Sequence, residues 1–255
     1  MCLAVAPEFT FVQMADTQMG FTNGNGDLAV EIQHLQTAMK MVNEIKPAFV
    51  VISGDLLNEA HSIKQTRAFW NAASGLSKDI PLHLVPGNHD LGKTTAQDIK
   101  TYRKLFGKDY YHFTHQNSDF IVMDSCLLFE PAADPEIKAD QRKWFDETIA
   151  AIQKRNPAHI FICTHHAWFL AKPDEENRYE NVPLTERNYY LDAFKRAGVQ
   201  YALAGHVHRN GIASDGGLTV IATGAVSKNL DGSKPGFRVF TVKGDKVDSH
   251  FVELP

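Results

Sequence analysis

The sequence predicts an α/β fold in which two mixed β-sheets pack face to face and helices cover their outer faces, a four-layer αββα sandwich. In the first half, apolar runs alternate with segments of helical period, the order typical of parallel strands joined by helices. The later runs lie closer together and read as hairpins, which indicates a second sheet. With 255 residues, 44% of them hydrophobic, and no convincing linker, a single domain over residues 1–255 is expected.

Nine short runs rich in β-branched and aromatic residues predict the strands. They are residues 9–16, 48–55, 82–90, 119–125, 159–166, 201–208, 218–225, 237–245 and 249–254.

Five segments carry apolar residues at helical spacing. They are residues 28–42, 63–76, 94–106, 139–154 and 185–197. Pro47 ends the first of them and Gly198 caps the last. Three polar loops remain, residues 17–27, 127–138 and 167–184, and loops of that length in a compact domain often line a site.

The composition limits the partners. The formal net charge of −4 gives no basic surface for nucleic acid or for an anionic membrane, so neither is expected as a partner, and attraction for an anionic substrate must be local. No apolar stretch approaches the roughly 20 residues of a membrane span. The first residues lack the basic segment of a secretion signal and two of the three cysteines lie in apolar runs, so a cytoplasmic location is expected, with a trimmed signal as the alternative. The oligomeric state is left open.

Five of the predicted strands end on side chains that can bind a metal. These are Asp16, Asp55, Asn88 with His89, His165, and His206 with His208. A single aspartate after a strand is usually a helix cap or a turn former. Ligands of open α/β sheets collect beyond the carboxyl ends of strands, so five such ends together predict one convergent site.

The donor types indicate a catalytic pair of metals. Carboxylates, imidazoles and an amide oxygen suit two divalent transition ions, and the lack of thiolates in the set argues against a structural zinc site. A glycine precedes each of Asp55, Asn88 and His206, which leaves space for the backbone to turn near the metals.

These residues stand in five short blocks, which are DTQ at 16–18, GD at 54–55, GNHD at 87–90, THH at 164–166 and GHVH at 205–208. In this order, the blocks resemble the motifs of the calcineurin-like metallophosphoesterase superfamily. The superfamily pattern is D-x-H, G-D, G-N-H-[DE], a lone His after a strand, and G-H-x-H. A first block of the form D-x-Q and a last block continuing as G-H-x-H-R-N are similar to the subgroup typified by calcineurin-like phosphoesterase domain-containing protein 1.

This resemblance implies a ligand set for two divalent ions, which would be manganese, iron or zinc. Asp16, Gln18 and His208 would hold one ion, Asn88, His165 and His206 the other, and Asp55 would bridge them. Gln18 stands where the superfamily usually has histidine. Its amide oxygen suits manganese better than zinc or iron, so manganese is favoured. The alternative is that Gln18 does not touch the metal.

The resemblance also implies the chemistry. A hydroxide shared by the two ions would be the nucleophile, because a bound metal lowers the pKa of water. His89 would contact the phosphoryl group and protonate the leaving alkoxide, with Asp90 or Asn58 orienting its ring. The two ions outweigh the negative charge of Asp16, Asp55 and one hydroxide, which favours an anionic substrate.

Further substrate contacts are expected from residues beside the motifs. Asn88 and His89 would touch the phosphoryl group, and Arg209 would either clamp a phosphate or form a surface salt bridge. Strand alternation places His166 on the face opposite His165, with contact to substrate or metal as the alternative.

The aromatic residues of loop 167–184 have two interpretations. Trp168, Phe169 and Tyr179 either pack onto the core or form a lid that selects the leaving group, and the lid is favoured.

Three functions are weighed. The first is a phosphomonoesterase acting on a phosphorylated small molecule or phosphoprotein, including a protein Ser/Thr phosphatase. The second is a phosphodiesterase acting on nucleotides or phospholipid head groups. The third is a binding scaffold without turnover, which is disfavoured because only the Gln18 position departs from the pattern.

Overall fold

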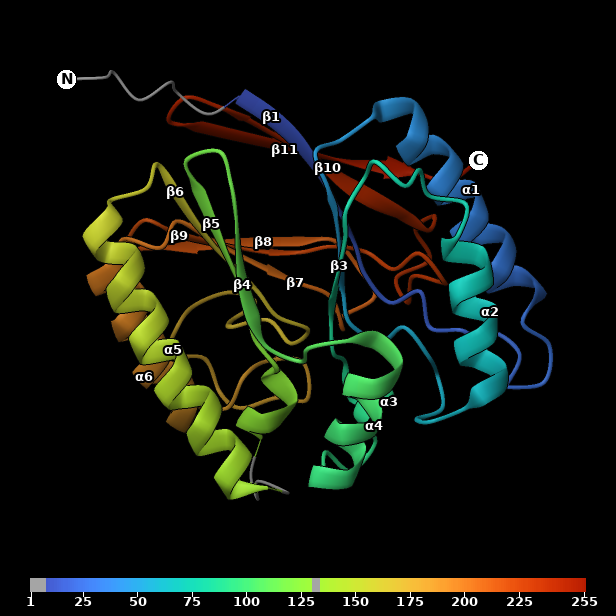
Figure 1. Ribbon diagram of the computed structural model, residues 1–255, viewed down its shortest axis with the longest axis horizontal. Coiled ribbons are helices and arrows are strands. Elements are labelled where there is room, and N and C mark those ends of the chain that lie inside the picture. Colours follow the sequence, from blue (N-terminus) through green and yellow to red (C-terminus); the bar gives the residue numbers. More distant parts are fainter. Residues whose placement is uncertain (1–7, 130–133) are drawn as a thin grey trace.

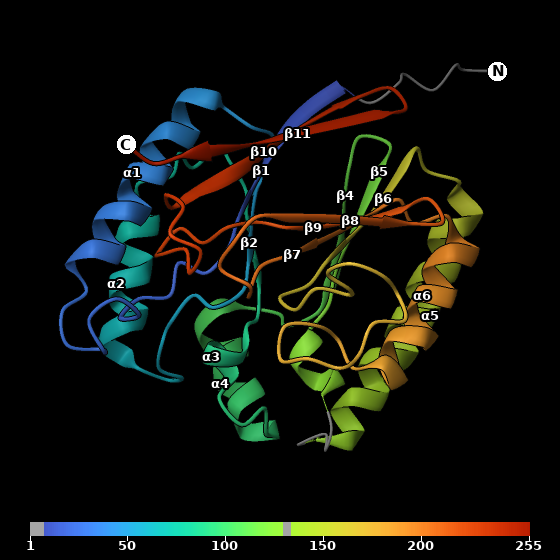
Figure 2. The same ribbon diagram turned by 180° about the vertical axis from the view of Figure 1, so that it is seen from behind.

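The computed structural model describes residues 8–129 and 134–255, and it confirms two mixed sheets with helices outside them (Figures 1 and 2). In chain order the elements are β1 (Glu8–Met14), α1 (Ala29–Ile45), β2 (Val50–Ser53), α2 (Ile63–Ala73), β3 (Leu82–Val85), α3 (Asn88–Leu91), α4 (Ala96–Phe106), β4 (Tyr111–His115), β5 (Ser118–Val122), the 3-10 helix η1 (Ser125–Leu128), α5 (Pro135–Arg155), β6 (His159–Cys163), α6 (Leu184–Ala197), β7 (Tyr201–Ala204), β8 (Gly211–Asp215), β9 (Leu218–Ala222), β10 (Gly236–Lys243) and β11 (Lys246–Glu253).

The first sheet joins the two ends of the chain, in the order β11-β10-β1-β2-β3. Strands β1, β2 and β3 are parallel and are connected through α1 and α2, as the strand-helix alternation predicts. The C-terminal hairpin β10–β11 pairs antiparallel with β1. The sequence correctly indicates two sheets, but this last hairpin completes the first sheet and does not belong to the second.

The second sheet has the order β4-β5-β6-β7-β9-β8. Its four middle strands are parallel, and β4 and β8 close its edges as antiparallel strands. Neither edge strand is predicted from the sequence. Their residues are mostly half-buried or exposed, so neither strand carries the apolar run by which the other strands are recognised.

The two sheets meet through a layer of aromatic side chains. Phe11 of β1 stacks on Phe240 of β10 with ring centroids 4.6 Å apart, and Phe120 stacks on Phe161 across β5 and β6, also at 4.6 Å. The Phe11 and Phe161 rings then meet edge to face at 5.4 Å. Helices α1 and α2 cover the outer face of the first sheet, and α5 and α6 cover that of the second, which confirms the αββα layers (Figure 1).

The helix boundaries differ from the predicted ones by a few residues. Helix α5 begins one turn early, at Pro135, because Asp134 caps it by accepting a hydrogen bond from the Ile137 N–H at 3.0 Å. Helix α5 therefore takes over the end of the predicted loop 127–138, of which residues 130–133 lie outside the described residues. Within residues 8–129 and 134–255, no helix is long and apolar enough to cross a membrane.

The carboxyl ends of the parallel strands from both sheets meet at one end of the sandwich. One backbone hydrogen bond in each sheet ties neighbouring strand ends together. In the first sheet it runs from the Asp16 N–H to the Gly54 carbonyl at 3.1 Å, and in the second from the Gly205 N–H to the His165 carbonyl at 2.9 Å. The predicted metal ligands therefore come from adjacent strand ends and face one another across the two sheets.

Candidate metal centre

Beyond their strands, the ligand-bearing segments turn through the left-handed region of backbone conformation. Positive φ angles occur at Asp16 (51°), Gln18 (34°), Asp55 (50°), His206 (67°) and His208 (48°). Non-glycine residues rarely adopt such angles, which cost roughly 1–3 kcal/mol each unless the surroundings enforce them. Five strained residues at one end of the sandwich indicate a site whose geometry is imposed by the fold.

The two predicted aspartates lie in the middle of this site. Asp16 and Asp55 are buried, and together with His165 they bring three ligand atoms within 4.8 Å of one another. One Asp55 oxygen accepts a hydrogen bond from the His89 N–H at 2.9 Å and lies 3.4 Å from the His165 imidazole. One Asp16 oxygen lies 3.4 Å from Nε2 of His208. Each carboxylate thus faces an imidazole that the sequence assigns to the same metal pair.

Backbone carbonyls fix the ring orientation of the three predicted histidine ligands. The pairs are His165 Nδ1 with the Ser53 carbonyl (2.8 Å), His208 Nδ1 with the Lys228 carbonyl (2.7 Å) and His206 Nε2 with the Tyr179 carbonyl (3.0 Å). A carbonyl only accepts, so each ring carries its proton on the outer nitrogen. The inner nitrogen of each ring then presents a lone pair to the centre, as in protein metal sites.

The inner atoms crowd together in a way that suits a cation. Nε2 of His165 lies 3.1 Å from Nδ1 of His206 and 3.0 Å from Oδ1 of Asn88. With the outer nitrogens protonated, these three atoms are all acceptors and would repel one another. A divalent ion among them would replace that repulsion by three bonds, so the donor set fits the implied metal.

Gln18 supports the same conclusion for the other half of the site. Its side chain is buried, and its Nε2 donates to Oδ1 of Asn58 at 3.3 Å. Its Oε1 is buried and has no hydrogen-bond partner among the described residues. A buried amide oxygen left without a partner costs free energy, and a bound cation would remove that cost.

Three motif glycines are pressed against the ligands. A Cβ added at Gly54 would clash with the His165 ring, one at Gly87 with the Asp55 carboxylate, and one at Gly205 would lie 2.8 Å from Oδ2 of Asp16. The sequence predicts glycine here to leave space near the metals. The structure shows that the ligand side chains themselves fill that space.

His89 and Asp90 have different surroundings. Nδ1 of His89 lies 2.8 Å from the Asn58 carbonyl, so of the two orienting partners considered from the sequence it is Asn58, through its backbone, that holds the ring. The Asp90 carboxylate is buried and accepts the N–H groups of Leu57 and Gly87, both at 2.9 Å. It fixes the backbone turn that carries the two preceding residues.

Burial and mutual charge shift the titration of the central groups. Burial raises the pKa of Asp16 to about 6, against the pull of His208. Burial alone would also raise the pKa of Asp55, but the charge and hydrogen bond of His165 outweigh it and lower that pKa to about 2. Burial likewise opposes charging of His165, and Asp55 reverses this and raises its pKa to about 9. Asp55 thus favours a positive charge at the position of His165, the charge that a bound cation would supply.

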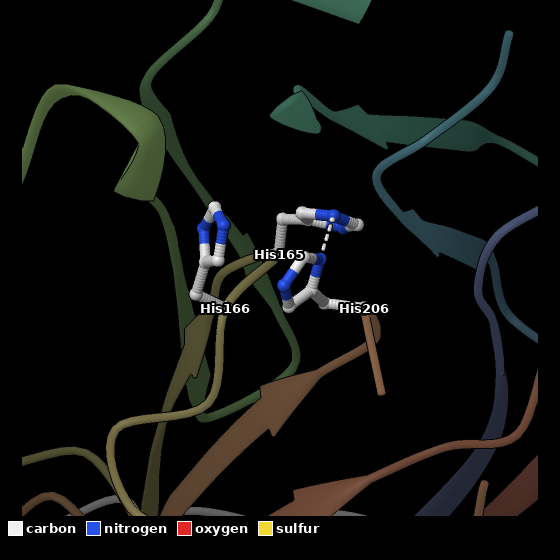
Figure 3. A group of neighbouring side chains, drawn as sticks. All are labelled: His165, His166 and His206. Carbon is white, nitrogen blue, oxygen red and sulfur yellow. Dashed lines mark hydrogen bonds between the residues drawn. The ribbon is translucent and has the colours of Figure 1, made fainter. Parts of the chain in front are cut away.

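His166 lies inside the site, contrary to the expectation from strand alternation. It is buried, its ring centroid is 4.3 Å from that of His206, and its ligand atom falls within 4.8 Å of those of His165 and His206 (Figure 3). Its Nδ1 lies 2.9 Å from the Ser125 hydroxyl. The prediction is wrong because β6 ends at Cys163, so alternation no longer applies at His166.

The lid predicted for Trp168 and Phe169 is also wrong, since both side chains are buried in the core beneath α5 and α6. Tyr179, from the same loop, is 66% exposed and lies against the centre, with its ring centroid 4.5 Å from that of His206. Arg209 is exposed, directly after His208.

The sequence profile of the calcineurin-like phosphoesterase family matches residues 9–210, which include every predicted ligand. The chain belongs to the calcineurin-like phosphoesterase family. With the centre described above, this calcineurin-like phosphoesterase is a metal-dependent enzyme, and the family resemblance read from its motifs is confirmed.

Individual relatives indicate the subgroup of this calcineurin-like phosphoesterase, and solved structures show its fold. It is 30% identical over 262 residues to the serine/threonine-protein phosphatase CPPED1 of Rattus norvegicus, covering 96% of this chain and 84% of that protein, which confirms the expected subgroup. A dimetal phosphatase from Danio rerio superimposes with a TM-score of 0.70, at 16% identity, and covers 98% of this chain and 100% of that one. GAP50, the anchor in the inner membrane complex of Plasmodium, gives 0.73 at 16% identity, covering 96% and 84%. At these identities the two structures show the fold alone.

Proposed function

We propose that the protein is a phosphomonoesterase that uses two divalent ions. The observation that carries the proposal is the convergence of Asp16, Asp55 and His165 within 4.8 Å, with His89 attached to Asp55 through its backbone N–H. Asp16, Gln18 and His208 would hold one ion, Asn88, His165 and His206 the other, and Asp55 would lie between them. When bound, such ions lower the pKa of water towards about 7 and attract a phosphoryl anion.

His89 would supply the proton for the leaving group. Its Nδ1 is held at 2.8 Å by the Asn58 carbonyl, which keeps a proton on that nitrogen. A second proton, on Nε2, is then free to pass to the oxygen that leaves the phosphorus. Asp90 would contribute by positioning, because it anchors the turn of Asn88 and His89 through backbone N–H groups.

Three further side chains would contact the substrate. Asn88 and His89 are half-buried, so both can meet a phosphoryl group that enters from solvent. His166 lies among the imidazoles with its Nδ1 held by Ser125, which supports a contact through its other nitrogen. Arg209 is exposed beside the ligand His208 and would attract the phosphate at the rim.

Two observations support the proposed substrate and metal. A relative that covers 96% of this chain is named a serine/threonine-protein phosphatase, which supports a phosphorylated serine or threonine in a protein as substrate. Gln18 offers a neutral amide oxygen, a donor that suits manganese better than zinc or iron, so manganese is the proposed ion.

We further propose a cytoplasmic location. The two described cysteines, Cys126 and Cys163, are unpaired thiols, as is typical of proteins from a reducing compartment.

A substrate panel tests this function. Protein freed of metal by chelation and reloaded with Mn²⁺ is assayed on p-nitrophenyl phosphate, its bis-ester, a cyclic nucleotide, single-stranded DNA, and phosphoserine and phosphothreonine peptides. We expect hydrolysis of the monoesters and peptides, loss of it in H89N, and unchanged rates in H250N, which alters an exposed histidine of β11. Faster hydrolysis of the bis-ester or of DNA, or no hydrolysis at all, would overturn the proposal.

A further inference from the structure

We infer that Tyr179 binds the substrate, its phenol O–H donating a hydrogen bond to a non-bridging oxygen of the phosphoryl group. The inference rests on the proposed function and adds to it a residue that lies outside the family motifs.

The loop between β6 and α6 is built around a buried carboxylate. Glu175 accepts the backbone N–H groups of Leu170 and Ala171, at 2.8 and 2.9 Å, and the side-chain amide of Asn181 at 2.7 Å. These bonds join residues on both sides of Tyr179's position. A loop whose two arms share one carboxylate has few conformations available to it.

The buried guanidinium of Arg187 holds the loop between β6 and α6 through its carbonyl groups. Arg187 of α6 is fully buried and donates to the carbonyls of Val182, Pro173 and Glu175, all at 2.8–2.9 Å. Hydrogen bonds from a charged donor inside a protein are stronger than those between neutral groups. The loop is therefore a rigid support for the residue at its tip.

Tyr179 is attached to two of the proposed ligands of one metal. Its carbonyl accepts from Nε2 of His206 at 3.0 Å, its ring packs on the same imidazole, and its hydroxyl lies 3.1 Å from Nδ2 of Asn88. Two-thirds of the side chain nevertheless stays open to solvent. It is thus in contact with the centre on one side and accessible to a substrate on the other.

The direction of the Asn88 contact leaves a donor free. If Oδ1 of Asn88 faces the metal, its Nδ2 group only donates, so the Tyr179 oxygen must be the acceptor in that bond. The phenolic proton of Tyr179 then takes no part in the bond to Asn88 and can be donated to another acceptor. An anionic oxygen held beside Asn88 is an acceptor within its reach, and such a bond strengthens the grip on a phosphoryl group without adding a charge.

The test compares Y179F with wild type, both loaded with Mn²⁺, and uses Y189F as control. Tyr189 is a half-buried tyrosine of α6 whose hydroxyl donates to Asp146, so the control also removes one phenolic oxygen. Binding of inorganic phosphate is measured by calorimetry, and KM and kcat with p-nitrophenyl phosphate. We expect Y179F to bind phosphate about ten- to hundred-fold more weakly than wild type. Its kcat/KM should fall by a similar factor, mainly through a higher KM, and Y189F should match wild type.

The readouts separate the possible outcomes. Phosphate binding by Y179F as tight as that of wild type would overturn the inference, whether or not the protein hydrolyses the ester. If wild type binds phosphate but hydrolyses no ester, the proposed function is wrong. In that case, weaker phosphate binding by Y179F would still support the inference. If Y179F loses Mn²⁺ affinity, measured separately, Tyr179 acts only by holding Asn88, and the inference is wrong.

Discussion

The backbone N–H of His206 donates to Oδ2 of Asp16 at 2.9 Å, and this bond joins the end of β7 in one sheet to the end of β1 in the other. Close by, the Val226 N–H bonds to the Ala15 carbonyl at 2.9 Å. The Asp16 carboxylate, which would bind a metal, therefore also links the two sheets by a hydrogen bond. Metal binding and the packing of the sandwich should depend on each other.

Substituting Asp16 tests this double role. D16N keeps an acceptor for the His206 N–H but loses the negative charge that would hold an ion. We expect Mn²⁺ stoichiometry to fall from two per chain to one, and hydrolysis to fall about a hundred-fold or more. Metal analysis by mass spectrometry and an assay on p-nitrophenyl phosphate measure both. D192N, at an exposed position of α6, is the control, and two tightly held ions in D16N would contradict the assignment.

A methyl group at residue 205 should displace the Asp16 carboxylate and so weaken the metal centre. In G205A the new Cβ would lie 2.7 Å from the Ser53 carbonyl and 2.8 Å from Oδ2 of Asp16. Such overpacking costs about 1–3 kcal/mol, so the urea midpoint should fall and Mn²⁺ should bind more weakly. In the control G211A the nearest atom is 3.9 Å away, and no change is expected. Equal stability of both variants would show that the loop relaxes freely.

Gln18 should decide which metal binds. In Q18H an imidazole replaces the unpartnered amide oxygen, and histidine tolerates the positive φ of this position. We expect tighter binding of Zn²⁺ relative to Mn²⁺, and in Q18L an Mn²⁺ affinity about ten- to hundred-fold lower at one of the two sites. Competition titrations with a coloured chelator measure both. The control is Q36L, an exposed position of α1, and wild-type Mn²⁺ affinity in Q18L would mean that Gln18 is not a ligand.

The sequence predicts the central strands, and the polar residues at their ends, for one physical reason. Parallel strands buried on both faces must be apolar throughout, so the polar residue that ends each run stands out. An edge strand such as β4 carries no such signal, because none of its residues is fully buried. Hairpin β10–β11 is easily found, but its pairing with β1 depends on contacts more than 200 residues apart along the chain, which no local pattern records.

Around the centre, the sequence fails where regular structure ends. His166 lies three residues beyond the last residue of β6, where period-2 alternation has no meaning, and the ring turns back towards His206. Trp168 and Tyr179 share one loop and one residue class, yet the first is buried and the second is 66% exposed. The hydrogen bonds of Glu175 and Arg187 hold the loop in which Tyr179 faces the metal site, and no local sequence pattern records them.

Stability should depend on pH through Asp124, a buried carboxyl beneath the site. Its Oδ1 accepts from the Cys126 N–H at 2.9 Å, and its Oδ2 has no partner in the described part of the chain. Burial, assisted by the charge of Asp109, raises the pKa of Asp124 to about 8. Between the ordinary carboxyl pKa near 4 and this value, the folded state holds a proton that the unfolded state has released, so stability falls as pH rises.

The variant D124N removes this titration and resembles the protonated acid. The free energy of unfolding of D124N minus that of wild type should increase as pH rises from about 5 to about 8. The increase is at most about 1.4 kcal/mol per pH unit for one proton. Urea unfolding at several pH values, with both proteins free of metal, gives the difference. Parallel curves for the two proteins would mean that Asp124 is ionised in the folded state.

Arg187 should control the order of the loop that carries Tyr179. Lysine in R187K keeps the charge but lacks the planar fork that reaches three carbonyls at once, so at least one of them loses its partner. An unsatisfied buried carbonyl costs about 1–3 kcal/mol, enough to raise the open population of the loop about five-fold or more. Hydrogen exchange over residues 170–182 should therefore speed up, and phosphate should bind more weakly, as in Y179F. R196K, at an exposed position of the same helix, serves as the control. If exchange speeds up over residues 170–182 while phosphate affinity stays at the wild-type value, the loop does not need to be rigid to present Tyr179.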